Sequence, residues 1–222
     1  MIGSNPGKKL ILILIFLSVL FLADIINLDL EGAERSISVK IKLKVVVEQK
    51  ICQKNPQWQK DIKTAVKRAS KYYDEYYLKF SVEKFAAMTE EQFQLRLKQD
   101  GPAFLKQDIE PDGCDVVFII ATHFPRCVNP LADLFLSRFT ANYVGVANRI
   151  GGDEFLAVSE LTKEDIPQLV WTIVHEMGHI LGAEHVGDQL SFMHPYFNPM
   201  AIYFDQKNAE IILKNKLRFS KK

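Results

Sequence analysis

The sequence predicts an α/β fold with a mostly parallel sheet. Segments with the residue pattern of strands alternate along the chain with segments of helical periodicity. One strand segment, residues 114–124 (CDVVFIIATHF), is apolar throughout its middle, as expected of a strand covered on both faces. Strands that alternate with helices in this way are typical of α/β proteins.

The first half of the chain is predicted to form strands and helices in alternation. Residues 36–49 (SISVKIKLKVVVEQ) alternate apolar and basic side chains and then turn continuously apolar, which predicts the first strand. Residues 80–88 predict a short second strand, and residues 89–99 predict a surface helix with Thr89 as its cap. Between the two strands, residues 56–80 predict a long amphipathic helix, because apolar side chains recur at helical intervals: Trp58, Ile62, Ala65, Val66, Ala69, Tyr72 and Tyr73.

The second half adds strands and one very regular helix. Residues 143–152 (YVGVANRIGG) and 154–160 (EFLAVSE) predict two strands, which brings the sheet to five. Pro167 places the start of the helix within residues 164–166, since only the first turn tolerates proline. Its apolar side chains form one stripe: Ile166, Leu169, Val170, Ile173, Val174, Met177, Ile180 and Leu181. His175 and His179 both lie roughly 160° from the middle of that stripe.

Composition and charge limit the classes of partner. The chain has 222 residues with 48% hydrophobic side chains, which is enough for one domain, residues 34–222, behind a leader. Lys and Arg number 28 against 27 Asp and Glu, and the body of the chain has no long basic block. We therefore expect no nucleic-acid partner, and instead a monomer that acts on a peptide or a neutral molecule.

Residues 1–33 predict a leader that sends the rest of the chain across a membrane. Two lysines, Lys8 and Lys9, precede an apolar run over residues 10–22, and acidic residues follow it. The run suits a signal peptide better than a membrane span, which needs about 20 residues. The cleavage sites are poor, however, so residues 10–28 could also be an uncleaved anchor. The domain is expected outside the cytoplasm, either secreted or anchored.

The segment HEMGHILGAEH, residues 175–185, holds three of the five histidines. His175 and His179 are one helical turn apart, so both imidazoles can reach a single tetrahedral Zn²⁺. Glu176 lies beside them and is off the apolar stripe, where a carboxylate can take a proton from zinc-bound water. Gly182 tolerates the positive φ of a turn, and this turn delivers His185 to the same ion. Three ligands leave an open position, which predicts one catalytic Zn²⁺.

These residues resemble the metzincin zinc proteases. The segment matches the consensus H-E-x-x-H-x-x-G-x-x-H at every fixed position. Met193, in LSFMHP, resembles the methionine of the family's Met-turn, and Pro195 would close that turn. The resemblance implies a metzincin-type domain: a twisted, mostly parallel five-stranded sheet with an antiparallel edge strand, long helices including the active-site helix, and a small C-terminal subdomain ending in a helix.

Two families within this group remain open. The spacing from the third histidine to Met193 and the M-x-P ending are similar to those of matrixins. The segments GVANRIGG and FLAVSE instead resemble the substrate-binding edge of the reprolysins. A tyrosine ligand of the astacin kind would fall at Pro195, so Tyr196 is not assigned to the metal.

The resemblance also implies where a substrate binds. An extended peptide would lie antiparallel to the strand around Val144, Gly145, Val146 and Ala147, and residues 195–204, with Tyr196, would form the outer wall of the specificity pocket. The glycines could equally mark an edge-strand bulge, and the aromatic residues could be core.

Three cysteines, an odd number, leave one thiol over in an oxidising compartment. If the first and third strands are parallel, Cys52 and Cys127 both follow strand ends on the same edge of the sheet, whereas Cys114 begins its strand at the opposite edge. A Cys52–Cys127 disulfide is therefore predicted. The segment FPRCVNP also resembles the inhibitory cysteine switch of matrixin propeptides, although it lies inside the domain.

The function that these residues predict is a zinc-dependent endopeptidase with Glu176 as general base. Two alternatives stay open: a zinc-binding pseudo-protease that serves as a binding module, and a zinc hydrolase of a non-peptide substrate. The intact Glu176 argues against the first, because a binding module needs no general base.

Overall fold

The computed structural model describes residues 36–89, 91–92, 109–121, 145–147, 154–159 and 166–220; of residues 145–147 and 154–159 it describes the backbone. From Ser38 on, the chain forms one compact unit. The predicted leader, residues 1–33, lies outside the described residues. Within the described ranges, no helix has the length and apolar character needed to cross a bilayer.

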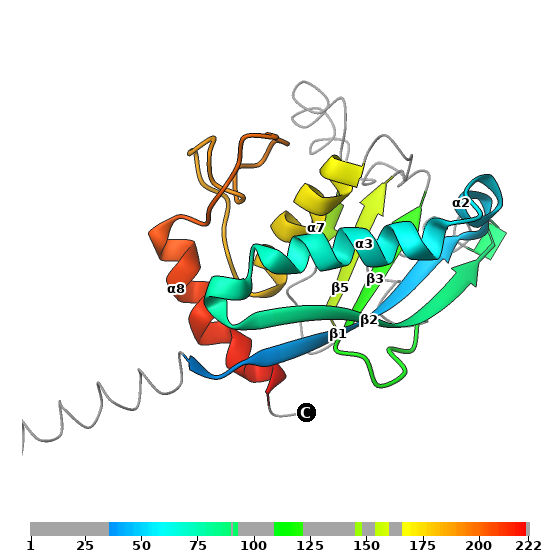
Figure 1. Cartoon of the computed structure of the whole chain (residues 1–222), viewed down its shortest axis with the longest axis horizontal. Helices are drawn as coiled ribbons and strands as arrows, with labels where there is room; N and C mark the ends of the chain where they lie inside the picture. The colour runs from blue at the N-terminus through cyan, green and yellow to red at the C-terminus, as the bar shows by residue number, and fades with distance from the viewer. Residues whose placement is uncertain are drawn as a thin grey trace, which may run out of the picture. The chain divides into compact units, whose positions relative to one another are not determined.

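A single mixed sheet runs through the unit, in the strand order β2-β1-β3-β5-β4. Four strands run parallel to one another: β1 (Val39–Glu48), β2 (Leu78–Met88), β3 (Val116–Ala121) and β5 (Glu154–Ser159). The short strand β4 (Gly145–Ala147) pairs antiparallel with β5 at the edge (Figure 1). The predicted mixed α/β fold is confirmed.

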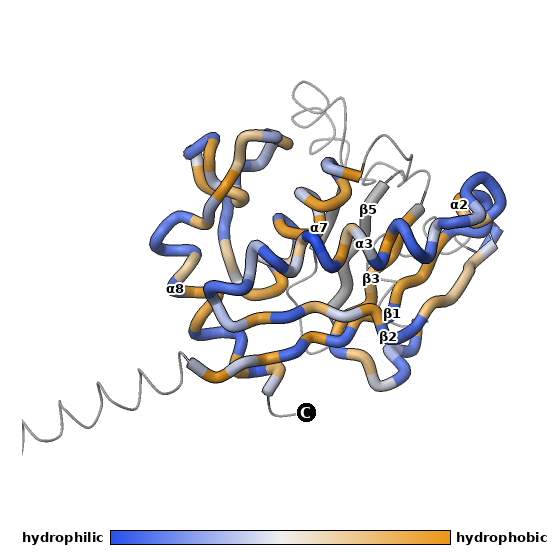
Figure 2. The backbone as a smooth tube through the Cα atoms, viewed as in Figure 1, coloured by the Kyte–Doolittle hydropathy of each residue, from blue (hydrophilic) through white to orange (hydrophobic). Residues whose placement is uncertain are grey.

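The inner strand β1 follows its residue pattern. Near its start Lys40 and Lys42 are exposed whereas Ile41 and Leu43 are fully buried, so one face of the strand is exposed to solvent and the other belongs to the core. Figure 2 shows the hydropathy of the residues along the chain. Further along, every residue from Val45 to Glu48 is buried. The continuous valine run therefore marks the part of the strand that is covered on both faces.

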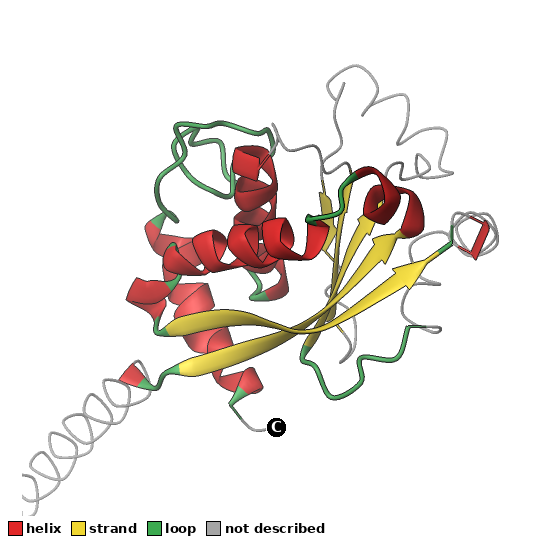
Figure 3. Cartoon of the chain, turned by 45° about the vertical axis from the view of Figure 1, so that its right-hand side comes forward, coloured by secondary structure: helices red, strands yellow, loops and turns green. Residues whose placement is uncertain are grey.

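Helices α2 (Gln49–Lys54), α3 (Trp58–Lys71) and α7 (Ile166–Ile180) contact strands of this sheet, and α8 (Gln206–Asn215) follows them in the chain. There are also short 3₁₀ turns, η1 (Asp74–Tyr76) and η4 (Lys216–Phe219). Helix α3 contacts both β2 and α7, and α7 contacts β4 and β5 (Figure 3). The core lies between these helices and the sheet, where Leu43, Phe118 and Ile173 belong to one buried apolar cluster.

Two predicted boundaries are wrong, both for tertiary reasons. The helix predicted over residues 56–80 ends at Lys71, because Tyr77 takes a left-handed conformation with φ of 56° and Leu78 already pairs with Val39 in the sheet. The first strand ends at Glu48, and the sequence analysis missed the short helix α2 that follows it.

The predicted cap at Thr89 has the geometry of a capping box. The Gln92 N–H donates to Thr89 Oγ1 at 3.2 Å, and the Thr89 N–H donates to Gln92 Oε1 at 3.0 Å. Residues 93–99 of that predicted helix lie outside the described residues. Helix α7 is described from Ile166 onward, which leaves Pro167 in its first turn.

Candidate metal centre

Three histidines converge where helix α7 ends. His175 and His179 come from successive turns of the helix, and His185 comes from the segment that follows it. The three Nε2 atoms form a triangle with every side 3.1 Å long. Four-coordinate zinc with Zn–N bonds of about 2.0–2.1 Å would hold its ligand atoms about 3.3 Å apart, so the triangle has the size of one face of a zinc tetrahedron.

The tautomers of the first two histidines support a cation between them. His175 Nδ1 lies 2.7 Å from the Phe192 carbonyl oxygen, and His179 Nδ1 lies 2.9 Å from the Ala183 carbonyl oxygen. A carbonyl only accepts, so each Nδ1 carries the proton and each Nε2 presents a lone pair. Two lone pairs facing each other at 3.1 Å do not form a hydrogen bond. The two Nε2 lone pairs fit a metal ion, and the backbone carbonyls orient the two imidazole rings.

Two of the three histidines, His175 and His185, have lowered pKa values in the metal-free protein. Burial is the main cause that lowers the pKa of His175 to about 3, and the nearby His179 adds to it, although the hydrogen bond to Phe192 acts the other way. Burial, and then His194, lower the pKa of His185. Both shifts favour the neutral imidazole, which is the form that binds a metal ion.

Gly182 makes the turn between the helix and His185. Its φ is 95°, and its N–H donates to the His179 carbonyl at 2.9 Å. A Cβ added at Gly182 would lie 2.4 Å from Asn215 Nδ2 and 3.1 Å from Ile211 Cγ2. Both the backbone conformation and the approach of α8 therefore require glycine here.

Replacing Gly182 with alanine should lower the free energy of unfolding of the zinc-free protein by about 1–3 kcal/mol, because strain at positive φ adds to the clash with Asn215. Urea denaturation measures this change. Gly187→Ala is the matched control, since Gly187 has no positive φ and a Cβ there meets nothing within 4 Å. Equal stability of the two variants would show that the turn at Gly182 tolerates a side chain.

Met193 lies beneath the histidine-bearing helix. It is fully buried, and a Cβ added at Gly178 would approach its Sδ to 2.6 Å. The Met193 N–H donates to Ser191 Oγ at 3.1 Å, and its carbonyl accepts from the Val186 N–H at 3.1 Å. Pro195 is exposed two residues on. The turn around Met193 thus contacts both α7, at Gly178, and the segment that carries His185, at Val186.

Glu176 is buried on α7, with 5% of its surface exposed. Burial raises its pKa to about 8 in the metal-free protein. The fully buried Tyr73 lies close by: its hydroxyl donates to the Val174 carbonyl at 2.6 Å, and Glu176 contributes to the raised pKa of its phenol, after burial and Tyr76. Glu176 is thus a buried carboxyl group that directly follows His175 in the sequence of α7.

The stability of the zinc-free protein should fall as the pH rises from 6.5 to 8. Folded Glu176 keeps its proton up to pH about 8, whereas the unfolded side chain loses it near its ordinary pKa of 4.5, so unfolding releases a proton in this window. The lowered pKa of His175 makes stability rise with pH, which is the opposite effect, but only between pH about 3 and 6.5. We expect a loss of about 1–2 kcal/mol.

Urea denaturation across this pH range, with a chelator present, measures the loss. Glu176→Gln replaces the titrating carboxyl with a neutral group of the same shape, so its stability should stay level from pH 6.5 to 8. A parallel fall in the variant would assign the effect to another group.

Two aromatic side chains that the sequence did not predict as part of the site, Trp171 and Phe197, lie beside the first histidine. The Trp171 ring stacks on His175 with centroids 4.8 Å apart and planes at 23°, and Phe197 meets Trp171 edge-on at 5.5 Å. Trp171 and His175 are four residues apart on a helix, and this spacing brings side chains into contact, so the stack could have been predicted from the sequence. Trp171 Nε1 is buried and has no acceptor in the described part of the chain.

The remaining predicted residues are only partly placed. Gly145, Val146 and Ala147 form the edge strand β4, and α7 contacts this strand. Tyr196 is 45% exposed on the segment after Met193. Cys52 is half-buried and has no disulfide partner among the described residues. Val144 and Cys127 lie outside the described residues, so the Cys52–Cys127 pairing stays a prediction.

Comparison with known proteins settles the family. The matrixin family model matches residues 40–213, a range that covers nearly the whole sheet, the histidine triangle and most of α8. The chain belongs to the matrixin family. The resemblance to metzincins is therefore confirmed, and of the two families left open by the sequence it is the matrixins that match.

The fold of this matrixin is similar to that of archaemetzincin from Methanopyrus kandleri, with a TM-score of 0.51 and 16% identity over 81% of this chain and 96% of that chain. Metalloproteinase-II from Bacteroides fragilis also matches, with a TM-score of 0.43 and 16% identity over 81% of this chain and 55% of that chain. No curated protein sequence matches the matrixin significantly. The first similarity supports a metzincin-like fold.

Proposed function

We propose that this matrixin is a zinc-dependent endopeptidase in which His175, His179 and His185 hold one zinc ion and Glu176 is the general base. The observation that carries the proposal is the triangle of Nε2 atoms, 3.1 Å on each side, with two Nδ1 protons fixed by backbone carbonyls. When bound, zinc with three imidazole ligands keeps one position open, polarises a carbonyl and lowers the pKa of water toward 7.

Glu176 carries out the proton transfer in this proposal. Its carboxylate accepts a proton from the attacking water and then donates it to the nitrogen of the leaving amine. A zinc ion held by the three histidines would lower the pKa of Glu176 from its metal-free value of about 8, which would favour the carboxylate that the first step needs. A group that holds and releases a proton near neutral pH suits both steps.

The substrate is a peptide that adds to the edge of the sheet. Strand β4 ends the strand order, pairs only with β5 among the described strands and is in contact with α7. An extended peptide can therefore pair with the backbone of β4 beside the histidines. The exposed side chains of Tyr196, Phe197 and Met200 offer apolar surface after Met193, which supports a preference for apolar substrate residues.

The reaction takes place outside the cytoplasm, a part of the proposal that rests on the sequence of the leader, residues 1–33. Cell fractionation combined with protease protection tests the proposed location. A catalytic unit that is found in the cytoplasm, and that intact cells protect from added protease, would contradict it.

Cleavage of a mixed peptide library by the full chain tests the proposed reaction. The expected result is one bound zinc per chain and cleavage within peptides that a chelator abolishes and added zinc restores. If the protein binds zinc but cleaves no peptide, the endopeptidase is ruled out, and the two alternatives, a pseudo-protease and a hydrolase of a non-peptide substrate, remain. A protein that binds no zinc would overturn the site itself.

A further inference from the structure

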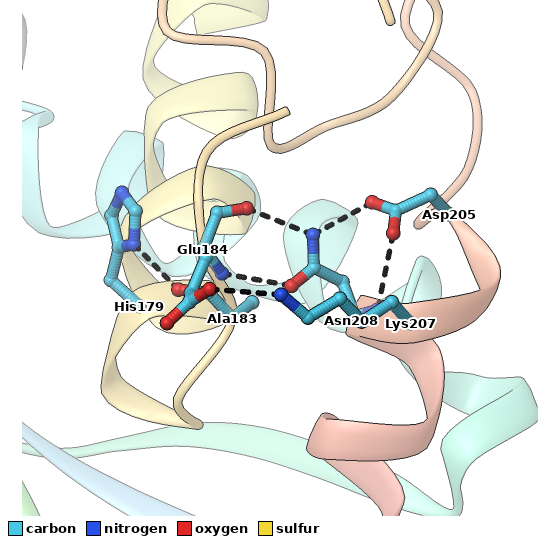
Figure 4. Close-up of polar contacts among 6 residues, drawn as sticks. All are labelled: His179, Ala183, Glu184, Asp205, Lys207 and Asn208. Carbon is cyan, nitrogen blue, oxygen red and sulfur yellow. Dashed lines mark hydrogen bonds and ion pairs between the residues drawn. The ribbon is translucent and has the colours of Figure 1, made fainter. Parts of the chain in front are cut away.

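One buried amide from the C-terminal helix holds the chain between the second and third histidines. Asn208 is fully buried in the first turn of α8. Its Oδ1 accepts from the Glu184 N–H at 2.8 Å, and its Nδ2 donates to the Glu184 carbonyl at 2.8 Å (Figure 4). The side chain therefore satisfies both backbone groups of a single residue, as a neighbouring strand would.

Glu184 occupies the critical position in that segment. The residue before it, Ala183, provides the carbonyl that orients His179, and the residue after it is the third histidine, His185. Any displacement of the Glu184 backbone moves both the partner of one histidine and the attachment point of another. The amide of Asn208 thus acts on two members of the triangle through one peptide segment.

The orientation of this amide is fixed by Asp205. Asn208 Nδ2 also donates to Asp205 Oδ2 at 2.7 Å, while the other carboxylate oxygen of Asp205 caps α8 by accepting from the Asn208 N–H at 3.2 Å. With oxygens on the Nδ2 side and an N–H on the Oδ1 side, only one of the two amide orientations makes all the bonds. Helix α8 therefore presents Asn208 already oriented (Figure 4).

The same face of the C-terminal segment closes the end of α7. Asn215, two helical turns after Asn208, donates to the Leu181 carbonyl at 2.8 Å, and Arg218 donates to the Ile180 carbonyl. The last carbonyls of a helix lack partners within it, so these contacts are helix caps. These caps bind carbonyls that precede Gly182 in the chain. Asn208 instead binds the backbone after Gly182, in the segment that carries His185.

A nearby ion pair does not account for the placement of Glu184. Lys207 Nζ lies 3.0 Å from Glu184 Oε2, but the two side chains are 69% and 52% exposed. Exposed pairs of this kind contribute little to geometry or stability, because water screens them and both side chains are long.

We propose that Asn208 is a positioning residue of the metal centre, whose amide holds the Glu184 backbone so that His185 completes the triangle of Nε2 atoms. The inference rests on the zinc site of the proposed function. It assigns to α8 a role in metal affinity, which differs from a general contribution to stability.

Zinc affinity of the full chain, measured by competition with a chromophoric chelator, tests the proposal. Asn208→Ala and the volume-matched Asn208→Leu should each raise the zinc dissociation constant by about 10- to 100-fold, the usual cost of losing a group that orients a metal ligand. The absorption bands of the cobalt-substituted variants should also shift, because the ligand field at His185 changes.

Two control variants separate positioning from stability. Lys207→Ala removes the exposed ion pair and should leave the dissociation constant unchanged. Asn215→Ala removes a cap from the same face of α8, so it should lower the urea stability of the zinc-free protein and leave the cobalt bands in place. Asn208 variants with wild-type zinc affinity, or an equal loss of affinity in Asn215→Ala, would overturn the proposal.

The readouts also distinguish this inference from the proposed function. Peptide hydrolysis plays no part in them, so a chain whose zinc affinity depends on Asn208 but that cleaves no peptide would overturn only the proposed peptidase function. A wild-type chain without zinc affinity would overturn the metal site and the role of Asn208 with it.

Discussion

Replacing Glu176 with glutamine should lower kcat/KM for peptide hydrolysis by about 10²- to 10⁴-fold, the contribution of a positioned general base. Glutamine keeps the shape of the side chain in its buried position but cannot accept the proton of the attacking water. The three histidines are untouched, so the variant should still bind one zinc ion. Hydrolysis of a fluorogenic peptide, with zinc content determined on the same sample, measures both quantities.

Glu48→Gln is the matched control for that experiment. Among the described residues, Glu48 and Glu176 are the buried glutamates, with 3% and 5% of their surfaces exposed. Glu48 ends strand β1 and belongs to no part of the histidine triangle. Its variant should keep wild-type activity. Full activity in Glu176→Gln would remove the general base from the mechanism, and equal losses in both variants would point to a loss of packing.

His185→Ala should weaken zinc binding by more than about 100-fold, beyond the range usual for groups that only orient a ligand, and should abolish chelator-sensitive hydrolysis. The variant leaves two imidazoles on one helix, which form one edge of the triangle and cannot enclose the ion. Because His185 is itself exposed, its removal leaves no cavity in the core and the fold should persist. Competition with a chelator and circular dichroism measure the two effects.

His194→Ala is the control for the third ligand. His194 lies close enough to contribute to the lowered pKa of His185, but its Nδ1 is 3.2 Å from the Tyr196 carbonyl oxygen and it is not among the three grouped histidines. The variant should bind zinc as the wild type does. Retention of zinc by His185→Ala, or its loss in His194→Ala, would mean that the wrong histidine has been assigned.

The sequence predicted the parts of this protein that depend on local periodicity. Alternation located β1, and the repeat of apolar residues located α7 together with the face that carries His175 and His179. The ligand set was predictable for the same reason, since all three histidines fall within one helical turn and the loop that follows it.

What escaped prediction depends on contacts between distant residues. The end of α3 is decided by the pairing of Leu78 with Val39, which no local pattern contains. The carbonyl partners of His175 and His179 lie on Phe192 and Ala183, so they follow from the path of the backbone and carry no side-chain signature. Asn208 looks like an ordinary polar residue of a surface helix, and only the fold brings it to Glu184.

The dependence of the third histidine on α8 bears on how the protein is made. During synthesis the chain emerges from its N-terminal end and folds as it grows. All three histidines precede Asn208 in that order, and the cap from Asn215 comes later still. A nascent chain that has just exposed residues 175–185 therefore has the ligands but not the helix that arranges them. If Asn208 positions His185 as proposed, a nascent chain reaches its metal-binding form only after residues 206–215 have emerged from the ribosome and formed α8.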